Sequence, residues 1–336
     1  MFQAQRRASK LGPSDRWKLD TPVALFIFKR PGPTRRVFEA IARARPRKLL
    51  VVADGPRHAE EAERCAETRD VTKSADWGCE VLHDFSDLNM GADERLSSGL
   101  DWVFSQVDEA IVLEDDCLPS PSFFPFCEQL LDRYREDPRV MQISGSDFLF
   151  SNYRFPRSEA PASYYFTRYA MNWGWATWKR AWERFDLRLA TWPDCGQEVL
   201  SASLRHDPAA RAKLAEIFER VHTGEAAHWD YAWMYACLLH EGLSVSPSRN
   251  LVSNIGFGGD ASHCDDERHV LSNMWRSNIR RVRHPGSVEA DDRVDREIFR
   301  RRFTSAKEWR PLLLRLQQML RERRIPSRIK TLIPSG

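Results

Sequence analysis

Short apolar runs alternate with segments of helical periodicity over residues 21–150, and this alternation restricts the fold more than any other feature of the sequence. The apolar runs predict strands at 23–28, 48–55, 79–85, 110–116 and 139–145. The periodic segments predict helices at 31–45, 56–70, 91–107 and 120–137. Strands that alternate with helices indicate an α/β fold with a mostly parallel sheet flanked by helices. Ligands of such sheets bind at the carboxyl ends of the strands.

Three adjacent carboxylates end the fourth apolar run, in "EAIVLEDD". Glu114, Asp115 and Asp116 repel one another, so a cation or a hydrogen-bond donor has to neutralise them. Oxygen ligands select hard ions such as Mg²⁺ or Mn²⁺, which use few protein carboxylates together with substrate phosphates. The motif predicts a divalent metal and a nucleotide substrate. The alternative is a solvated acidic turn in which Asp115 or Asp116 caps the next helix.

Two further polar residues fall at the ends of neighbouring predicted strands. Arg30 follows the first strand and Asp54 follows the second. An arginine holds phosphate through a forked contact, and a carboxylate accepts hydrogen bonds from a nucleoside. The chain has neither GxGxxG nor GxxxxGK[ST], so no dinucleotide fingerprint or P-loop supports the site.

The residue pattern of the chain changes after about residue 150, which suggests a structural boundary there. Residues 163–185 are rich in aromatic side chains, helical patterns follow at 207–222 and 228–242, and "NIGFGGDASH" ends the region. We expect this half to pack on the sheet and to supply the rest of a cleft. The predicted organisation is a polar extension (1–20), a catalytic domain (21–275) with a nucleotide half to about 150 and an acceptor half from about 151, and a basic helical tail (276–336).

Charge and cysteine content limit the partners and the compartment. Residues 307–330 carry a net charge of +6 and residues 1–20 carry +3, so the total of +3 leaves −6 for the body, which argues against nucleic acid. Seven cysteines without a C-x-x-C, and a first twenty residues without an apolar run, predict a cytoplasmic protein with free thiols.

The end of the chain predicts a basic amphipathic helix. Apolar residues at 309, 312, 313, 316, 319 and 320 fall on one helical face, with Arg and Gln elsewhere. Such a helix suits peripheral contact with an anionic membrane at its inner face, which fits a lipid-linked acceptor. The alternative is a helix that docks on the body of the protein.

Five segments, taken in order, resemble a known family. They are "VALFIFKR", "LLVVADG", "GLDWVFSQVDEAIVLEDDCLPSPSFFPF", "NWGWATWKRAW" and "HWDYAWMY". The chain resembles the GT-A nucleotide-sugar glycosyltransferases over about residues 21–265, and most of all N-acetylglucosaminyltransferase I and its bacterial relatives. The resemblance implies a GT-A fold, Mn²⁺ or Mg²⁺ as cofactor, and transfer with inversion.

The resemblance also implies roles for individual residues. The last carboxylate of the family's EDD binds the metal, which makes Asp116 the metal ligand. Glu114 orients that ligand and Asp115 contacts the nucleoside. Asp54 takes the place of the aspartate that contacts uracil, and Arg30 that of the arginine that contacts the nucleotide.

A catalytic base is implied near residue 230. The family has it in a Trp-Asp-Asp-Trp segment, whereas this chain reads "WDYAW" from residue 229, with one aspartate and one added residue. Asp230 is the predicted base, which takes the proton of the acceptor hydroxyl. The alternative is that Asp230 is the N-cap of the following helix.

Three more residues are candidate site residues, and each has an alternative role that involves no ligand. Arg95 could reach a diphosphate or be a solvated surface arginine. His263, after a glycine-rich turn, is a candidate metal ligand or a surface histidine. Trp175 is a candidate for stacking on an acceptor sugar, against core packing.

The sequence therefore predicts a metal-dependent inverting glycosyltransferase. It would move a sugar from a UDP-sugar to a hydroxyl of a glycan or lipid-linked acceptor, in surface polysaccharide or glycoconjugate synthesis. N-acetylglucosamine as the sugar follows from the resemblance alone. The alternatives are a sugar-nucleotide nucleotidyltransferase and a non-catalytic nucleotide- or glycan-binding module.

Overall fold

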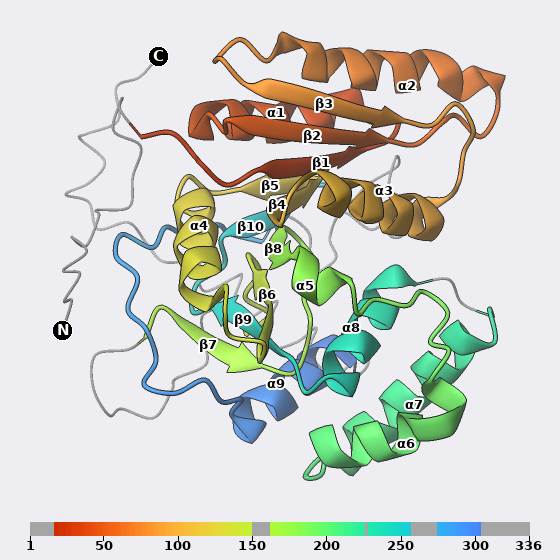
Figure 1. The fold of residues 1–336 in the computed structure, drawn as a ribbon, viewed down its shortest axis with the longest axis vertical. Helices are drawn as coiled ribbons and strands as arrows, with labels where there is room; N and C mark the ends of the chain where they lie inside the picture. Colours follow the sequence, from red (N-terminus) through yellow and green to blue (C-terminus); the bar gives the residue numbers. More distant parts are fainter. Residues whose placement is uncertain (1–16, 150–161, 226–227, 257–273, 304–336) are drawn as a thin grey trace, which may run out of the picture.

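The central sheet has eight strands among the residues that the computed structural model describes, which are 17–149, 162–225, 228–256 and 274–303. The strands are β1 (Val23–Ile27), β2 (Lys48–Ala53), β3 (Glu80–Phe85), β4 (Glu109–Glu114), β6 (Val140–Ser144), β7 (Tyr164–Thr167), β8 (Trp175–Trp178) and β9 (Leu243–Pro247). Their order is β3-β2-β1-β4-β8-β6-β9-β7, and only β8 and β7 run against the other six (Figure 1). The predicted α/β fold with a mostly parallel sheet is confirmed.

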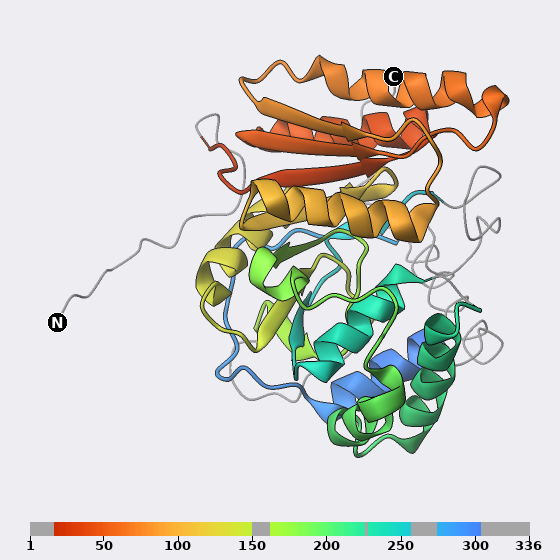
Figure 2. The ribbon, with the colours of Figure 1, turned by 45° about the vertical axis from the view of Figure 1, so that its right-hand side comes forward.

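Helices cover both faces of the sheet. They are α1 (Pro31–Ala44), α2 (Ala59–Val71), α3 (Ala92–Gln106), α4 (Phe123–Tyr134), α5 (Lys179–Trp182), α6 (Trp192–Ser203), α7 (Pro208–His222), α8 (Trp229–Leu239) and α9 (Asp292–Phe303). All five residues of β1 are buried, because a central strand of such a sheet is covered on both sides. Leu25 packs in the core that α1 and α4 cover, and Phe26 packs in the core that α3 covers. Figure 2 shows α1 and α3 on opposite faces of the sheet.

The second half of the chain joins the same sheet instead of only packing on it. β8 lies antiparallel between β4 and β6, and β9 and β7 complete the far edge. Behind β8 the indole rings of Trp175, Trp229 and Trp233 pack together, with ring centroids 5.7–5.9 Å apart. The aromatic richness of this half thus belongs largely to the core.

A small antiparallel ribbon lies beside the carboxyl end of β4. It consists of β5 (Cys117–Pro119) and β10 (Val252–Asn254), with Asn254 opposite Cys117. Just beyond this pair, the backbone N–H of Ile255 donates to the carbonyl of Asp116 at 2.9 Å. The ribbon therefore brings residues that are 140 positions away in the chain, Ile255 and Gly256, to the acidic strand end.

Residues 276–303 pack on the body, although the sequence places the end of the catalytic domain at about 275. Ile279 and Val282 are buried in the core under α1 and α4, and Val294 and Ile298 of α9 are buried in the other core. Between them, Ser163 donates its backbone N–H to the carbonyl of Arg283. The predicted amphipathic helix at 307–330 lies outside the described residues. Within them, no helix is long and apolar enough to cross a membrane.

Candidate active site

Arg30 lies against Asp115 and Asp116 where two parallel strands end side by side. β1 and β4 are neighbours, with Phe26 opposite Glu114, so the residues that follow each strand come together. Nε of Arg30 donates to Oδ2 of Asp115 at 3.2 Å, and Nη2 donates to Oδ1 of Asp115 and to Oδ2 of Asp116, the latter at 3.0 Å. This forked contact neutralises part of the acidic cluster.

The acidic strand end is buried, which excludes the alternative of a solvated turn. Asp115 is 3% exposed and Asp116 is 9% exposed. Neither caps the next helix, because the N-cap of α4 is Ser122. The chain instead turns after Glu114 into β5, a short strand that the sequence analysis did not predict.

Burial and mutual repulsion shift the protonation of this cluster. Burial, together with the charges of Asp116 and Asp115, raises the pKa of Glu114 to about 8, although Arg30 opposes this. Burial also raises the pKa of Asp115 to about 6 against the effect of Arg30. For Arg30 burial lowers the pKa, but the two aspartates outweigh it and the pKa is raised. Titratable groups with such strongly perturbed pKa values concentrate at functional sites.

Gly256 forms one wall of the cluster. A Cβ atom at this position would overlap with Oδ2 of Asp116 and would lie 2.7 Å from Nη1 of Arg30. The glycine is held in place, since its N–H donates to Oδ1 of Asn254 at 2.8 Å. The close approach of backbone to the two charged side chains thus requires the absence of a side chain here.

Asp230, on helix α8 in the second half of the chain, is close enough to the cluster for its charge to act on Glu114. It lies in the first turn of α8, and its charge is among the causes that raise the pKa of Glu114. The N-cap of α8 is His228, and the backbone N–H of Trp229 donates to Asp93, so the N-cap alternative for Asp230 is wrong. Oδ2 of Asp230 accepts from Nη2 of Arg302 at 3.2 Å.

The structure gives Asp54 a role in holding a loop. Its Oδ1 accepts from the N–H groups of Gly55 and Met90, and its Oδ2 accepts from the side chain of Asn89 and the N–H of Gly91. An ionised carboxylate offers about four acceptor sites, and the protein fills all of them. Contact with a base, as the resemblance implies, would require the exchange of one of these donors.

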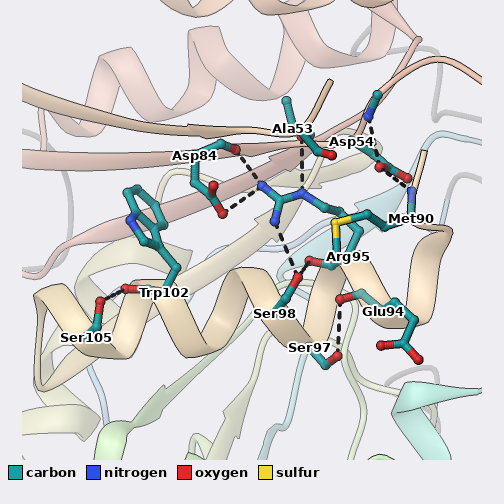
Figure 3. Close-up of polar contacts among 12 residues, drawn as sticks. Ala53, Asp54, Asp84, Met90, Glu94, Arg95, Ser97, Ser98, Trp102 and Ser105 are labelled. Atoms are coloured by element: carbon teal, nitrogen blue, oxygen red, sulfur yellow. Dashed lines mark hydrogen bonds and ion pairs between the residues drawn. The ribbon is translucent and has the colours of Figure 1, made fainter. Parts of the chain in front are cut away.

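Arg95 is a buried structural residue in place of the predicted diphosphate contact (Figure 3). Its Nε donates to the carbonyl of Ala53 at 3.2 Å, and its Nη2 donates to the carbonyl of Asp84 at 2.5 Å and to Oδ2 of Asp84 at 2.8 Å. Nη1 lies 3.5 Å from Oγ of Ser98. Nε and Nη2 therefore join α3 to the ends of β2 and β3, and the surface alternative is wrong as well.

Trp175 belongs to the core, so the prediction that it contacts an acceptor sugar is wrong. Its side chain is 1% exposed and stacks on Trp229 with planes 26° apart. Trp173, two positions earlier, is half-buried and packs against Phe148 at 5.4 Å, which leaves it the more accessible ring. Trp173 precedes β8, so the alternation of sides along a strand could not distinguish these two rings in the sequence. His263 lies outside the described residues.

The carboxylates fit a hard divalent cation in their chemistry. The three acidic side chains offer carboxylate oxygens as ligands, and among the described residues Oδ1 of Asp116 has only the weak S–H donor of Cys117 near it, at 3.5 Å. Among the residues described, no three His, Cys, Asp or Glu side chains converge to hold a metal by themselves. A cation at Asp116 would complete its shell with water and substrate phosphate, as Mg²⁺ commonly does.

Comparisons with known proteins identify no family. No protein-family model matches the chain, and no curated protein matches it. Similar solved structures include UDP-glucose pyrophosphorylase complexed with UDP-glucose (TM-score 0.26, 10% identity, 49% of this chain and 70% of that one). Mouse xyloside xylosyltransferase 1 in its apo form gives a TM-score of 0.34 at 13% identity, over 66% of this chain and 84% of that one. Apo UDP-glucose pyrophosphorylase gives 0.30 at 10% identity, over 69% and 93%.

Similarity of this extent carries no argument about activity. The class of the protein rests on its own geometry, which is an α/β fold whose parallel strands β1 and β4 end in a buried cluster of one arginine and three carboxylates.

Proposed function

We propose that the chain is a metal-dependent inverting glycosyltransferase that uses a UDP-sugar. The observation that carries the proposal is the cluster of Arg30, Glu114, Asp115 and Asp116 at the carboxyl ends of β1 and β4, with Asp230 near enough for its charge to act on Glu114. Ligands of open parallel sheets bind at this edge. The resemblance in the same segments names UDP-N-acetylglucosamine as the donor to test first. A glycan or a lipid-linked glycan is the proposed acceptor, in surface polysaccharide or glycoconjugate synthesis.

The roles of the residues follow from their charges and positions. Asp116 would hold Mn²⁺ or Mg²⁺, which neutralises the negative charge that develops on a leaving diphosphate. Arg30 holds Asp115 and Asp116 in place and offsets the electrostatic repulsion between the carboxylates of the cluster. Asp230 would take the proton of the acceptor hydroxyl as that oxygen attacks the anomeric carbon, and the bond to the diphosphate breaks on the opposite face.

Titration calorimetry with UDP, GDP and CDP, each with Mn²⁺ and then with EDTA, tests the proposal. We expect one nucleotide, UDP, to bind with Mn²⁺ and not with EDTA. Asp116→Asn should abolish the metal-dependent binding, while the surface control Asp132→Asn, at a side chain that is 50% exposed, should keep it. Equal affinity of wild type and Asp116→Asn for UDP in the presence of Mn²⁺ would contradict the assignment.

Asp230→Asn separates binding from chemistry. We expect this variant to bind UDP as the wild type does and to lose sugar transfer, because the amide cannot accept the proton. The measurement is UDP release from UDP-N-acetylglucosamine alongside calorimetry.

Formation of pyrophosphate from UTP and a sugar 1-phosphate by the wild type would instead identify a nucleotidyltransferase. Nucleotide binding without either reaction would identify a binding module.

A further inference from the structure

Helix α9 brings a residue from near the end of the described chain to the candidate base. Its apolar residues Val294, Ile298 and Phe299 are buried in the core that α3 and α8 share. At its start, Nη1 of Arg168 donates to Asp292 at 2.8 Å and to Asp295 at 2.7 Å. These contacts fix the direction of α9, so that its last turn reaches Asp230.

Arg302, in that last turn, makes contacts that its neighbours do not make. Arg300 and Arg301 both donate to Glu297 of their own helix, at 2.6–2.9 Å. Arg302 instead donates from Nη2 to Oδ2 of Asp230 on α8. Its side chain is 19% exposed, and its Nε is buried without a hydrogen-bond partner among the described residues. A buried unpaired donor lowers stability, so stability alone does not account for this placement.

Aromatic rings hold the guanidinium of Arg302 in place. It lies over Phe148 and over Phe303, 5.6 Å from the centroid of each ring. Phe303 in turn packs against Tyr231, the residue after the candidate base, at 6.3 Å. Cation–π contacts of this kind restrict where the guanidinium can lie. The packing of these rings therefore holds the Arg302 guanidinium in the position from which it donates to Asp230.

We propose that Arg302 is a positioning residue for Asp230, and that α9 is thereby part of the catalytic unit; this inference rests on the function proposed above. Asp230 is at the start of a helix with its side chain 30% exposed, so its carboxylate has room to rotate. The hydrogen bond from Arg302 fixes one oxygen, which leaves the other directed to the acceptor. A base must be held within a fraction of an ångström of its productive position.

The test is the rate of UDP release from UDP-N-acetylglucosamine with Mn²⁺ and water as acceptor, for wild type, Arg302→Met and Arg302→Lys. We expect Arg302→Met to lower kcat about 10- to 100-fold with the KM for the donor unchanged, because the donor site is intact. Arg302→Lys, which keeps a donor and a charge, should recover part of the rate. Arg300→Met, an equal loss of charge at an exposed position of the same helix, should leave kcat unchanged.

A double variant distinguishes positioning from a merely structural role. If Arg302 acts through Asp230, Asp230→Asn/Arg302→Met should be no slower than Asp230→Asn alone. Additive losses, or a kcat of Arg302→Met equal to that of the wild type, would overturn the inference while the proposed function stands. A wild type that binds no nucleotide in calorimetry would overturn the proposed function and this inference with it.

Discussion

Two buried aspartates, Asp115 and Asp116, pair with the same arginine, Arg30, so one positive charge offsets only part of their negative charge. The guanidinium of Arg30 contacts Asp115 through two nitrogens and Asp116 through one. The cluster nevertheless keeps an excess of negative charge, which adds to the effect of burial in raising the pKa of Glu114 to about 8. A site in this condition gains from any further cation.

Removal of Arg30 should therefore destabilise the protein in a pH-dependent way. We expect Arg30→Met to lower the free energy of unfolding by about 3–5 kcal/mol at pH 8, because two buried carboxylates lose their partner. The loss should be smaller at pH 5 than at pH 8, because without Arg30 the buried carboxylate of Asp115 takes up its proton at a higher pH than in the wild type, where its pKa is about 6. Added Mn²⁺ should restore part of it.

Urea denaturation at pH 5 and pH 8, with and without Mn²⁺, measures these effects. The control is Arg139→Met, an exposed arginine paired with Asp137, for which almost no change is expected. A stability of Arg30→Met equal to that of the wild type at pH 8 would show that the ion pair has little influence.

Gly256 lies so close to Asp116 that a side chain at this position should disturb the proposed metal ligand. A Cβ atom would collide with Asp116 and crowd Arg30, so Gly256→Ala should displace the carboxylate that is proposed to bind the metal. We expect metal-dependent UDP affinity to fall about 10-fold or more, as changes beside a metal ligand commonly do. Calorimetry measures this. Gly32→Ala, where a Cβ would meet nothing within 4 Å, should bind as the wild type does.

At the scale of elements, α9 is anchored to the sheet by a buried carboxylate. Asp295 accepts from the hydroxyl of Thr167 at the end of β7 and from Nη1 of Arg168. Burial raises the pKa of Asp295 from the ordinary 3.8 to about 6, against the effect of these two partners. Between these pH values the folded protein holds a proton that the unfolded chain has lost, so this contribution to stability falls as the pH rises.

The Asp295→Asn variant should lose that dependence. We expect the stability advantage of the wild type over Asp295→Asn to be larger at pH 4.5 than at pH 7. Urea denaturation of both proteins at the two pH values gives the comparison. Asp292→Asn removes the other carboxylate that Arg168 contacts and keeps Asp295, so it should retain the wild-type slope. An unchanged slope in Asp295→Asn would mean that another group carries the pH dependence.

At the scale of the whole molecule, the residues after 275 complete the core of a body that the sequence predicted to end there. Five apolar side chains of the described part of this stretch, residues 276–303, are buried, namely Ile279, Val282, Val294, Ile298 and Phe299. Burial of each contributes about 1.5–3 kcal/mol, so their combined loss is comparable with the net stability of a typical domain, roughly 5–15 kcal/mol.

A chain that ends at Trp275 should therefore not unfold cooperatively. We expect its circular dichroism to show no sharp thermal transition, whereas the full chain shows one. A full-length protein with Ile298→Ala, which loses about 2–5 kcal/mol, should unfold cooperatively at a lower temperature. A truncated chain with a wild-type transition would show that residues 276–303 are dispensable for the fold.

The parts of the site that could be predicted from sequence are those that local structure places. Arg30 and Asp116 each follow an apolar run, and the ends of neighbouring parallel strands meet at one edge. The roles of Arg95 and Trp175 could not be predicted in this way. Whether an arginine on a helix meets a phosphate or the carbonyl of Ala53 depends on how α3 crosses the sheet, which no local pattern records.

Local patterns in the sequence were enough to predict the α/β class, the strand ends that carry the carboxylates, and the helices α1 to α4, α7 and α8, because these depend on periodicities of two and 3.6 residues. Three features follow from the folded arrangement alone: β8 enters the sheet antiparallel, β10 brings Gly256 to Asp116, and α9 brings Arg302 to Asp230. These pairings join residues far apart in the chain, and their stability comes from the burial and charge pairing of surfaces that exist only once the chain has folded.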